Sequence, residues 1–356
     1  MSDADSQIRG QSADVPTLVW LDEPQLELAR SIADLARLRF VRAGSSSRAG
    51  SQTIAASLDA DPFDDLRAAI ASASAEEGDP IELVLLLSPG PFGSEGIDAD
   101  AQAVQAARSR GVRVISIEPV PASALVLAAG SWTRARHGTT PLEAIHTVPL
   151  IRRSAVFRDA TEVLQDFGGV RTLAVEAMCA AHEGSLGARL YSAMELIYDL
   201  MGEPELIDAA YAWPGAASSL HMLPGDSLRE LHGDLTANIR FADGRIASIV
   251  ASDRAGRWSR RATLINASGR LTLGESSWVL VRSDGIEDRG RDLGSEAPEA
   301  AAAIADAVSR RLDPATPDDP PTDAPVVLAM CQAALLSART GQGESPETIR
   351  RMSSIA

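Results

Sequence analysis

Histidine and cysteine, which often do proton-transfer or metal chemistry near neutral pH, number only five and two in this chain. The sequence contains no lysine, so its side-chain cations are arginine and histidine. Arginine stays protonated near neutral pH and is a poor proton donor or acceptor, so lysine-type catalysis is excluded. His221 and His232 have no metal-ligand spacing, and Cys179 and Cys331 lie in apolar stretches where we expect two buried thiols. We therefore predict no metal site.

The strongly negative net charge of the chain argues against some classes of binding partner. The chain has 356 residues, 45% of them hydrophobic, with a formal net charge of −16, which is enough for two domains with buried cores. So negative a chain repels phosphate polymers and anionic lipid, which argues against nucleic acid and membrane as partners. The start is polar and acidic, without the features of a signal peptide, and no apolar run approaches the roughly 20 residues that cross a bilayer. We expect a cytoplasmic protein.

Strands and helices alternate through about residue 125. The run Glu82 to Leu87 is apolar at every position after Glu82, which is typical of a central parallel strand covered on both faces. We expect a loop at 44–51 and a capped helix start at Asp61-Pro62 with Asp64 and Asp65, because Pro and acids favour the first helical turn. Other strands are predicted at 17–21, 39–42 and 112–117, and helices at 25–38 and 99–110. The pattern predicts an α/β fold, with a Rossmann-like doubly wound parallel sheet over 15–125 after a flexible amino terminus at 1–14.

The second half changes to a β pattern. A strand is possible at 145–151, helices are expected at 156–167 and 185–201, and a strand at 170–178 lies between them. Turn signals at Asp243-Gly244 and Ser268-Gly269 then join strands predicted at 207–213, 228–241, 245–252, 258–267, 270–273 and 278–283. We expect an antiparallel meander, in an α+β domain with a large, mostly antiparallel sheet over 126–312. A Pro- and Asp-rich linker at 313–325 leads to a final helix and tail at 326–356.

The first turn is acidic where a dinucleotide fold would place glycines. Asp22-Glu23-Pro24 follows the first strand, and Pro24 lacks the N–H that could contact a pyrophosphate. A carboxylate about 5 Å from one phosphate charge costs about 3 kcal/mol at an effective dielectric of about 20. The same acids stabilise a helix amino terminus by capping it and by facing its dipole. We therefore expect no ordinary pyrophosphate binding at this turn.

The order of elements, together with several local motifs, resembles a known family. The motifs are VRVISIEP at 112–119, Arg152-Arg153 followed by Gly168-Gly169-Val170, AMELIYDLMG at 193–202, the hairpin FADGRIA at 241–247 and AALLSARTGQGESP at 333–346. Over nearly its whole length the chain resembles the Gfo/Idh/MocA oxidoreductases, the group of glucose-fructose oxidoreductase and inositol dehydrogenase. The resemblance implies hydride transfer between NAD or NADP and a hydroxyl carbon of a sugar or cyclitol. It also implies a homo-oligomer formed through the open face of the second-domain sheet.

The reacting positions of that family are changed in this chain. Glu118 stands where the family has the lysine of its Glu-Lys-Pro motif, and Ala188 and Ser192 stand where it has aspartate and histidine. One hypothesis is a non-catalytic protein with a degenerate cofactor turn, which binds a ligand or serves in an assembly and has no cofactor. The alternative is an active NAD(P)-dependent oxidoreductase with rebuilt chemistry that uses Glu118, His182 or Tyr191.

The resemblance also places polar residues around the cleft between the domains. Clustered arginines beside a helix amino terminus would suit a carboxylate, a phosphate or a sugar acid, although each arginine could equally pair with surface acids. The candidate pocket residues are Arg152, Arg153, His182, Glu183, Arg189 and Tyr191. If NAD or NADP binds, the candidate contacts are Arg42, Ser45, Arg48, Ser88 and Pro89.

Overall fold

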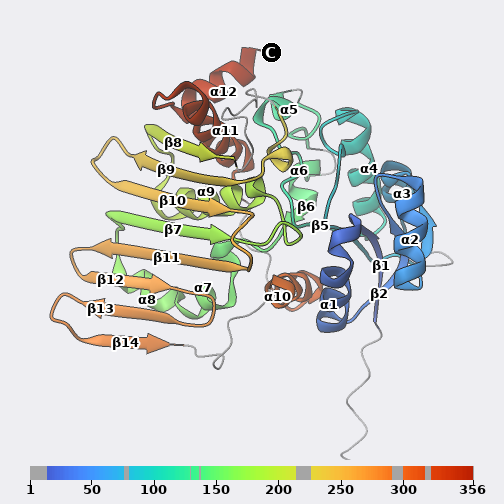
Figure 1. The fold of residues 1–356 in the computed structure, drawn as a ribbon, viewed down its shortest axis with the longest axis horizontal. Helices are drawn as coiled ribbons and strands as arrows, with labels where there is room; N and C mark the ends of the chain where they lie inside the picture. The colour runs from blue at the N-terminus through green and yellow to red at the C-terminus, as the bar shows by residue number, and fades with distance from the viewer. Residues whose placement is uncertain are drawn as a thin grey trace, which may run out of the picture.

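Two sheets organise the chain in this computed structural model. The structure describes residues 14–75, 80–128, 130–135, 138–213, 226–290, 300–316 and 322–355. Figure 1 shows the larger sheet on one side of the molecule and the smaller sheet with its helices on the other. The predicted flexible terminus, apart from residue 14, lies outside the described residues, as do His137, His221 and part of the predicted linker.

The smaller sheet has six strands, all parallel, in the order β3-β2-β1-β4-β5-β6. This is the doubly wound order of dinucleotide-binding folds, so the predicted Rossmann-like sheet is confirmed. Alternate residues of β1 and β4 enter opposite core clusters, because both faces of the sheet are covered. Its strands are β1 (Val15–Trp20), β2 (Leu38–Gly44), β3 (Asp61–Phe63), β4 (Leu83–Leu86), β5 (Arg113–Ser116) and β6 (Ile145–Thr147).

Helices cover both faces of this sheet. Their bounds are α1 (Leu26–Ala36), α2 (Arg48–Leu58), α3 (Leu66–Ser72), α4 (Ile97–Ser109), α5 (Ala124–Ala128) and α6 (Pro141–Ala144). The loop predicted at 44–51 is too long, since α2 begins at Arg48 with Ser47 as its cap. The helix start lies later than predicted, because Asp65 is the cap of α3 and Asp61-Pro62 form the edge strand β3, where a proline costs no ladder hydrogen bond.

The larger sheet has eight strands in the order β14-β13-β12-β11-β7-β10-β9-β8. Neighbouring strands are antiparallel except β7 and β10, so the predicted class of sheet is confirmed while the simple meander is wrong. The strand predicted at 228–241 is shorter than expected, because residues 228–230 form the 3-10 helix η3. The strands are β7 (Thr172–Met178), β8 (Leu206–Ala212), β9 (Asp234–Arg240), β10 (Ile246–Ser252), β11 (Ser259–Asn266), β12 (Gly269–Leu273), β13 (Trp278–Arg282) and β14 (Glu287–Gly290).

The remaining helices pack on the larger sheet, on α1 or on one another. Helix α9 (Leu186–Met201) packs on β7 and β10, and α11 (Ala324–Thr340), predicted as the final helix, packs on α9 and β8. Helix α10 (Ala300–Leu312) packs against α1, as Figure 1 shows, and adds its apolar side chains to that core. The helix expected at 156–167 divides at Ala160 into α7 (Ala155–Asp159) and α8 (Thr161–Phe167), and α12 (Pro346–Ile355) follows α11. Within the described ranges, none of the helices combines the length and apolarity needed to span a membrane.

Candidate functional site

The acidic turn after β1 is closed by its own side chains. Residues Glu23–Gln25 form one 3-10 turn, with Asp22 at its N-cap position. The buried Gln25 side chain accepts a hydrogen bond from the Asp22 amide at 3.1 Å and donates one to the Leu87 carbonyl at 3.2 Å. The Ser88 hydroxyl donates to the Asp22 carboxylate at 2.5 Å. The Gln25 side chain, the Asp22 amide and the Asp22 carboxylate of this turn are therefore all engaged in hydrogen bonds within the protein.

These residues do not fit the pyrophosphate of NAD(P). None of residues 21–26 has a positive φ, and each carries a side chain where a backbone approach would need glycine. The amides of Asp22 and Gln25 are already bonded, and Pro24 has none to offer. Two carboxylates, Asp22 and Glu23, stand at the helix start that would face the phosphates.

Most of the other predicted cofactor contacts are also engaged. The Arg42 guanidinium lies over the Phe63 ring, 5.3 Å from its centroid. Ser45 is buried, and its amide donates to the Ser51 hydroxyl at 3.0 Å. Ser88 bonds Asp22, as above, and Pro89 is buried after β4, whereas Arg48 is exposed at the start of α2. Ser45 and Ser88 follow β2 and β4, the two neighbours of β1 in the parallel sheet.

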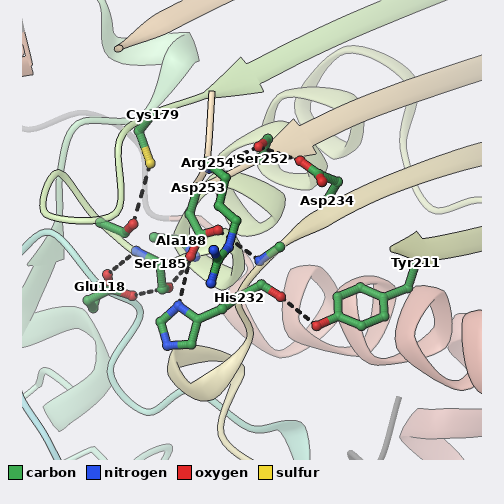
Figure 2. Close-up of polar contacts among 12 residues, drawn as sticks. Glu118, Cys179, Ser185, Ala188, Tyr211, His232, Asp234, Ser252, Asp253 and Arg254 are labelled. Atoms are coloured by element: carbon green, nitrogen blue, oxygen red, sulfur yellow. Dashed lines mark hydrogen bonds and ion pairs between the residues drawn. The ribbon is translucent and has the colours of Figure 1, made fainter. Parts of the chain in front are cut away.

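Glu118 lies at the end of the smaller sheet and meets the start of α9. Its buried carboxylate accepts hydrogen bonds from the Ser185 amide at 2.7 Å and the Ser185 hydroxyl at 2.6 Å. Ser185 also caps α9, because its hydroxyl accepts from the Ala188 amide at 3.0 Å. Burial raises the pKa of Glu118, although the Ser185 hydrogen bonds and the charges of Arg189 and Arg229 oppose that rise. Figure 2 shows this carboxylate against the helix start.

The two other family positions on α9 are structural. Ala188 is buried in the first turn of α9. The buried Ser192 hydroxyl accepts a hydrogen bond from the Ile151 amide at 3.1 Å. Neither side chain is an acid or a base, so these two positions supply no group able to exchange a proton with a ligand.

Arg189 is a buried cation next to Glu118. Its guanidinium lies over the Trp258 ring at 4.2 Å, and burial lowers its pKa. Among the described residues, no hydrogen-bond partner reaches its Nε or Nη1 atom. A methyl group at Gly184 would lie 3.4 Å from Arg189 Nη2 and 3.6 Å from Glu118 Oε1. Both charged groups therefore lie close to Gly184.

Arg229 joins the two sheets at the same place. It lies in η3 (Leu228–Glu230), and its guanidinium donates to the Ser94 hydroxyl at 2.7 Å. Burial lowers the pKa of Arg229 to about 10, and no partner among the described residues reaches its Nη1 atom. The Leu228 amide donates to the Ala122 carbonyl at 3.0 Å, which ties this segment to the first half of the chain.

His232 and Asp253 form a dyad beside these groups. His232 Nδ1 lies 2.7 Å from Asp253 Oδ2, and the Gly233 amide donates to Asp253 Oδ1 at 2.8 Å. The Asp253 side chain is 1% exposed and that of His232 46% exposed, so a buried acid holds an accessible imidazole. The hydrogen bond to Asp253 raises the pKa of His232. We call Glu118, Arg189, Arg229 and the His232–Asp253 dyad the junction site.

The dyad is absent from the sequence prediction, although the sequence holds a signal for it. Asp234 and Ser252 are partners in the β9–β10 register, on either side of the predicted Asp243-Gly244 turn. His232 and Asp253 lie just outside that pair. Counting outward from the turn would have placed them together.

The other predicted pocket residues lie elsewhere or make local contacts. Arg152 forms ion pairs with Glu195 and Asp199, both at 2.8 Å. Arg153 and Tyr191 line a different cavity of about 1170 Å³ along β6. His182 is exposed, and the Glu183 carboxylate accepts from the Ala180 amide at 2.7 Å. Of the predicted set, only Arg189 meets Glu118 at the junction site.

The thiols are buried and unpaired, as expected. Cys179 donates to the Gly184 carbonyl at 3.4 Å, and burial raises its pKa to about 12, so it is a poor nucleophile at neutral pH. In the part of the chain that the structure describes, no group of three or more His, Cys, Asp or Glu side chains is placed to hold a metal ion.

Known structures resemble this one over most of its length. An NAD-binding oxidoreductase from Klebsiella pneumoniae matches with a TM-score of 0.64 and 14% identity, over 94% of this chain and 99% of its own. A levoglucosan dehydrogenase in complex with NADH and levoglucosan matches at 0.63 and 12%, over 93% and 99%. The WlbA dehydrogenase from Bordetella pertussis, in complex with NADH and UDP-GlcNAcA, matches at 0.56 and 16%, over 93% and 98%.

Sequence comparison adds no relative to these. No protein-family model matches the chain, and no curated protein matches it either. At these identities the structural matches establish the fold and leave the activity open. The chain thus has the two-domain oxidoreductase fold of the Gfo/Idh/MocA-type dehydrogenases, as the sequence resemblance predicts.

Proposed function

We propose that this chain binds a small carboxylate ligand, of the sugar-acid class, at the junction site and does not hold NAD(P) at its first turn. The turn after β1 carries this proposal. Its Gln25 side chain occupies the hydrogen-bonding groups of Asp22 and Leu87, and its two acids face the place of a diphosphate. The dehydrogenase fold is then used for recognition without nicotinamide chemistry.

The two buried arginines support an anionic ligand. Arg189 and Arg229 each keep at least one buried N–H group without a partner among the described residues. Burying a cation without hydrogen bonds is costly, and a carboxylate can satisfy two guanidinium N–H groups at once. Glu118 lowers the local positive charge, but its oxygens are already bonded to Ser185. The sugar ligands of the levoglucosan and WlbA dehydrogenase structures support a hydroxyl-rich molecule.

Assembly through the open sheet face is the second part of the proposal. Ile246, Val250 and Ile265 are 50%, 41% and 40% exposed on β10 and β11, whereas Ala247, Ile249 and Leu264 on the other face are buried. Exposed apolar side chains that share one sheet face favour association with a second copy. Light scattering of the wild type and Val250→Asp tests this part, since the charge should shift a dimer or tetramer toward monomer.

The second candidate is an active NAD(P)-dependent oxidoreductase acting on a sugar or cyclitol hydroxyl. The His232–Asp253 dyad favours it, because an accessible imidazole oriented by a buried acid is suited to proton transfer. The NADH complexes of the structural neighbours support it as well. It requires the coenzyme to be held without the usual contacts at the first turn.

Two titrations of the purified protein separate the candidates. The fluorescence per NADH or NADPH added should equal that in buffer without the protein. Calorimetry, in contrast, should detect D-gluconate binding. The neutral polyol D-glucitol is the matched control and should not bind, because it lacks the carboxylate. Saturable NADH or NADPH binding at micromolar concentration would contradict the proposed function and favour the oxidoreductase.

A further inference from the structure

We propose that His232 is the acid–base residue of the junction site and takes up a proton when a carboxylate ligand binds there. The inference rests on the proposed function, since it needs an anion at this site. It assigns the contact with the ligand to the segment between η3 and β9, whereas the family pattern would look for a histidine on α9.

The hydrogen bonds of the dyad leave one ring nitrogen for a ligand. Asp253 Oδ2 holds His232 Nδ1 at 2.7 Å, and Asp253 is itself fixed through its other oxygen by the Gly233 amide. The tautomer with a proton on Nδ1 leaves the lone pair of Nε2 available. Because the ring is 46% exposed, Nε2 can be reached from outside the protein. A ring fixed on one side and accessible on the other is a built proton acceptor.

The charges around His232 favour its protonated form. Among the described residues, Asp253 and Glu118 attract the proton, while Arg254 and partial burial oppose it. The Arg254 guanidinium lies over the Trp213 ring, 5.3 Å from its centroid. A ligand carboxylate adds another negative charge at short range, so binding should draw a proton onto Nε2.

Glu118 and Asp253 are the other groups at the site that could take that proton, but the oxygens of both are already engaged in hydrogen bonds. Arg189 and Arg229 are cations already, and the Ser185 hydroxyl donates to Glu118. Ser192, in the place where the family has its histidine, is bonded to the Ile151 amide. Figure 2 shows the His232 ring, with its contact to Asp253, beside Ser185 and Glu118.

Calorimetry with D-gluconate in two buffers of different ionisation enthalpy measures the proton uptake. Near pH 8, above the usual histidine pKa of about 6.5, the wild type should take up a fraction of a proton per ligand. Its affinity should fall by up to about tenfold per pH unit above the pKa of His232. His232→Gln should bind more weakly, with no uptake and a flat pH profile. His146→Gln, which removes a histidine of β6 outside the dyad, should behave as the wild type.

Asp253→Asn gives a readout that a merely structural role would not produce. It removes the charge that favours the imidazolium, so the pH dependence should move to lower pH while gluconate still binds. Gluconate binding without proton uptake by the wild type, or unchanged uptake in His232→Gln, overturns this inference and leaves the proposed function standing. No gluconate binding by the wild type overturns both.

Discussion

Ser185 holds the Glu118 carboxylate at the amino end of α9 with two hydrogen bonds, from its amide at 2.7 Å and its hydroxyl at 2.6 Å. The same hydroxyl caps α9, so one small side chain serves both the helix and the contact between the two sheets. The position at which the family places its reactive lysine is thereby occupied by a buried, bonded acid.

Replacing Ser185 should cost more than the loss of an ordinary helix cap. Ser185→Ala removes the cap and leaves a buried carboxylate oxygen unsatisfied, so we expect about 2–4 kcal/mol of lost unfolding free energy. Ser154→Ala is the matched control, because Ser154 caps α7 through the Phe157 amide at 3.2 Å and should cost about 1 kcal/mol. Urea unfolding of both variants checks this. Equal losses would contradict the double role of Ser185.

A side chain at position 184 should abolish ligand binding. In Gly184→Ala the methyl group would lie 3.4 Å from Arg189 Nη2 and 3.6 Å from Glu118 Oε1, where the proposed ligand would contact them. Gly168→Ala is the control, because Gly168 also has a positive φ but a methyl group added there would meet no atom within 4 Å. Both variants should lose about 1–3 kcal/mol of stability from backbone strain. Only Gly184→Ala should lose D-gluconate binding in calorimetry, and gluconate bound normally by that variant would show that the ligand lies elsewhere.

Arg189 should matter for binding more than for stability. Arg189→Met keeps much of the packing on Trp258 and removes a buried cation whose Nε and Nη1 have no partner among the described residues, so stability should change little or rise. Losing a charge-assisted hydrogen bond should weaken D-gluconate binding about tenfold to a hundredfold. Arg152→Met is the contrasting variant, since it breaks the ion pairs with Glu195 and Asp199 and should lower stability with gluconate affinity unchanged. The reverse result would place the anion beside Arg152.

Gln25 should stabilise the closed turn. Gln25→Ala leaves the Asp22 amide and the Leu87 carbonyl without their buried partner, at a cost of about 1–3 kcal/mol. Gln52→Ala, on the exposed side of α2, should change stability by less than about 0.5 kcal/mol. Thermal unfolding of the two variants tests the difference. A stability of Gln25→Ala equal to that of the wild type would mean that the turn does not depend on this side chain.

The dyad should also give a pH-dependent contribution to stability. Because Asp253 raises the folded-state pKa of His232 above its usual value of 6.5, that contribution is fully present below pH 6.5. It is lost as the pH rises through the raised pKa. The difference in unfolding free energy between the wild type and His232→Gln should therefore shrink from acidic to alkaline pH. A difference that grows with pH would mean that the neutral imidazole is the stabilising form.

The sequence was a good guide where an element is decided by its own residues. The four residues of β4 are all fully buried, as the apolar run at 82–87 indicates. Ser45 to Ser47 were ambiguous, because a serine run is common in loops and Ser47 is also the cap of α2. Asp61-Pro62 suits a helix start or an edge strand equally, and pairing with β2 decides for the strand. Such choices depend on partners that a local pattern does not contain.

The site was harder to predict because it depends on strand pairing. Helix α10 could have been found, since Ala300, Ile304 and Val308 recur every four residues on its buried face. The position of β7 between β10 and β11 could not have been predicted, because the chain returns to pair with β7 only after α9, β8 and β9. Arg189, placed at the cleft by the resemblance, lies next to Glu118, whereas Arg152 pairs with acids that lie far from it in sequence. His232 and Asp253 needed the exact hairpin register.

A crystal of the protein soaked with NADH tests the central claim most directly. The closed, acidic turn should exclude the coenzyme, so the map should show no diphosphate beside Asp22, Glu23 and Pro24, and Gln25 should keep its bonds to Asp22 and Leu87. Coenzyme density seated over this turn, with the Gln25 side chain displaced, would contradict the account.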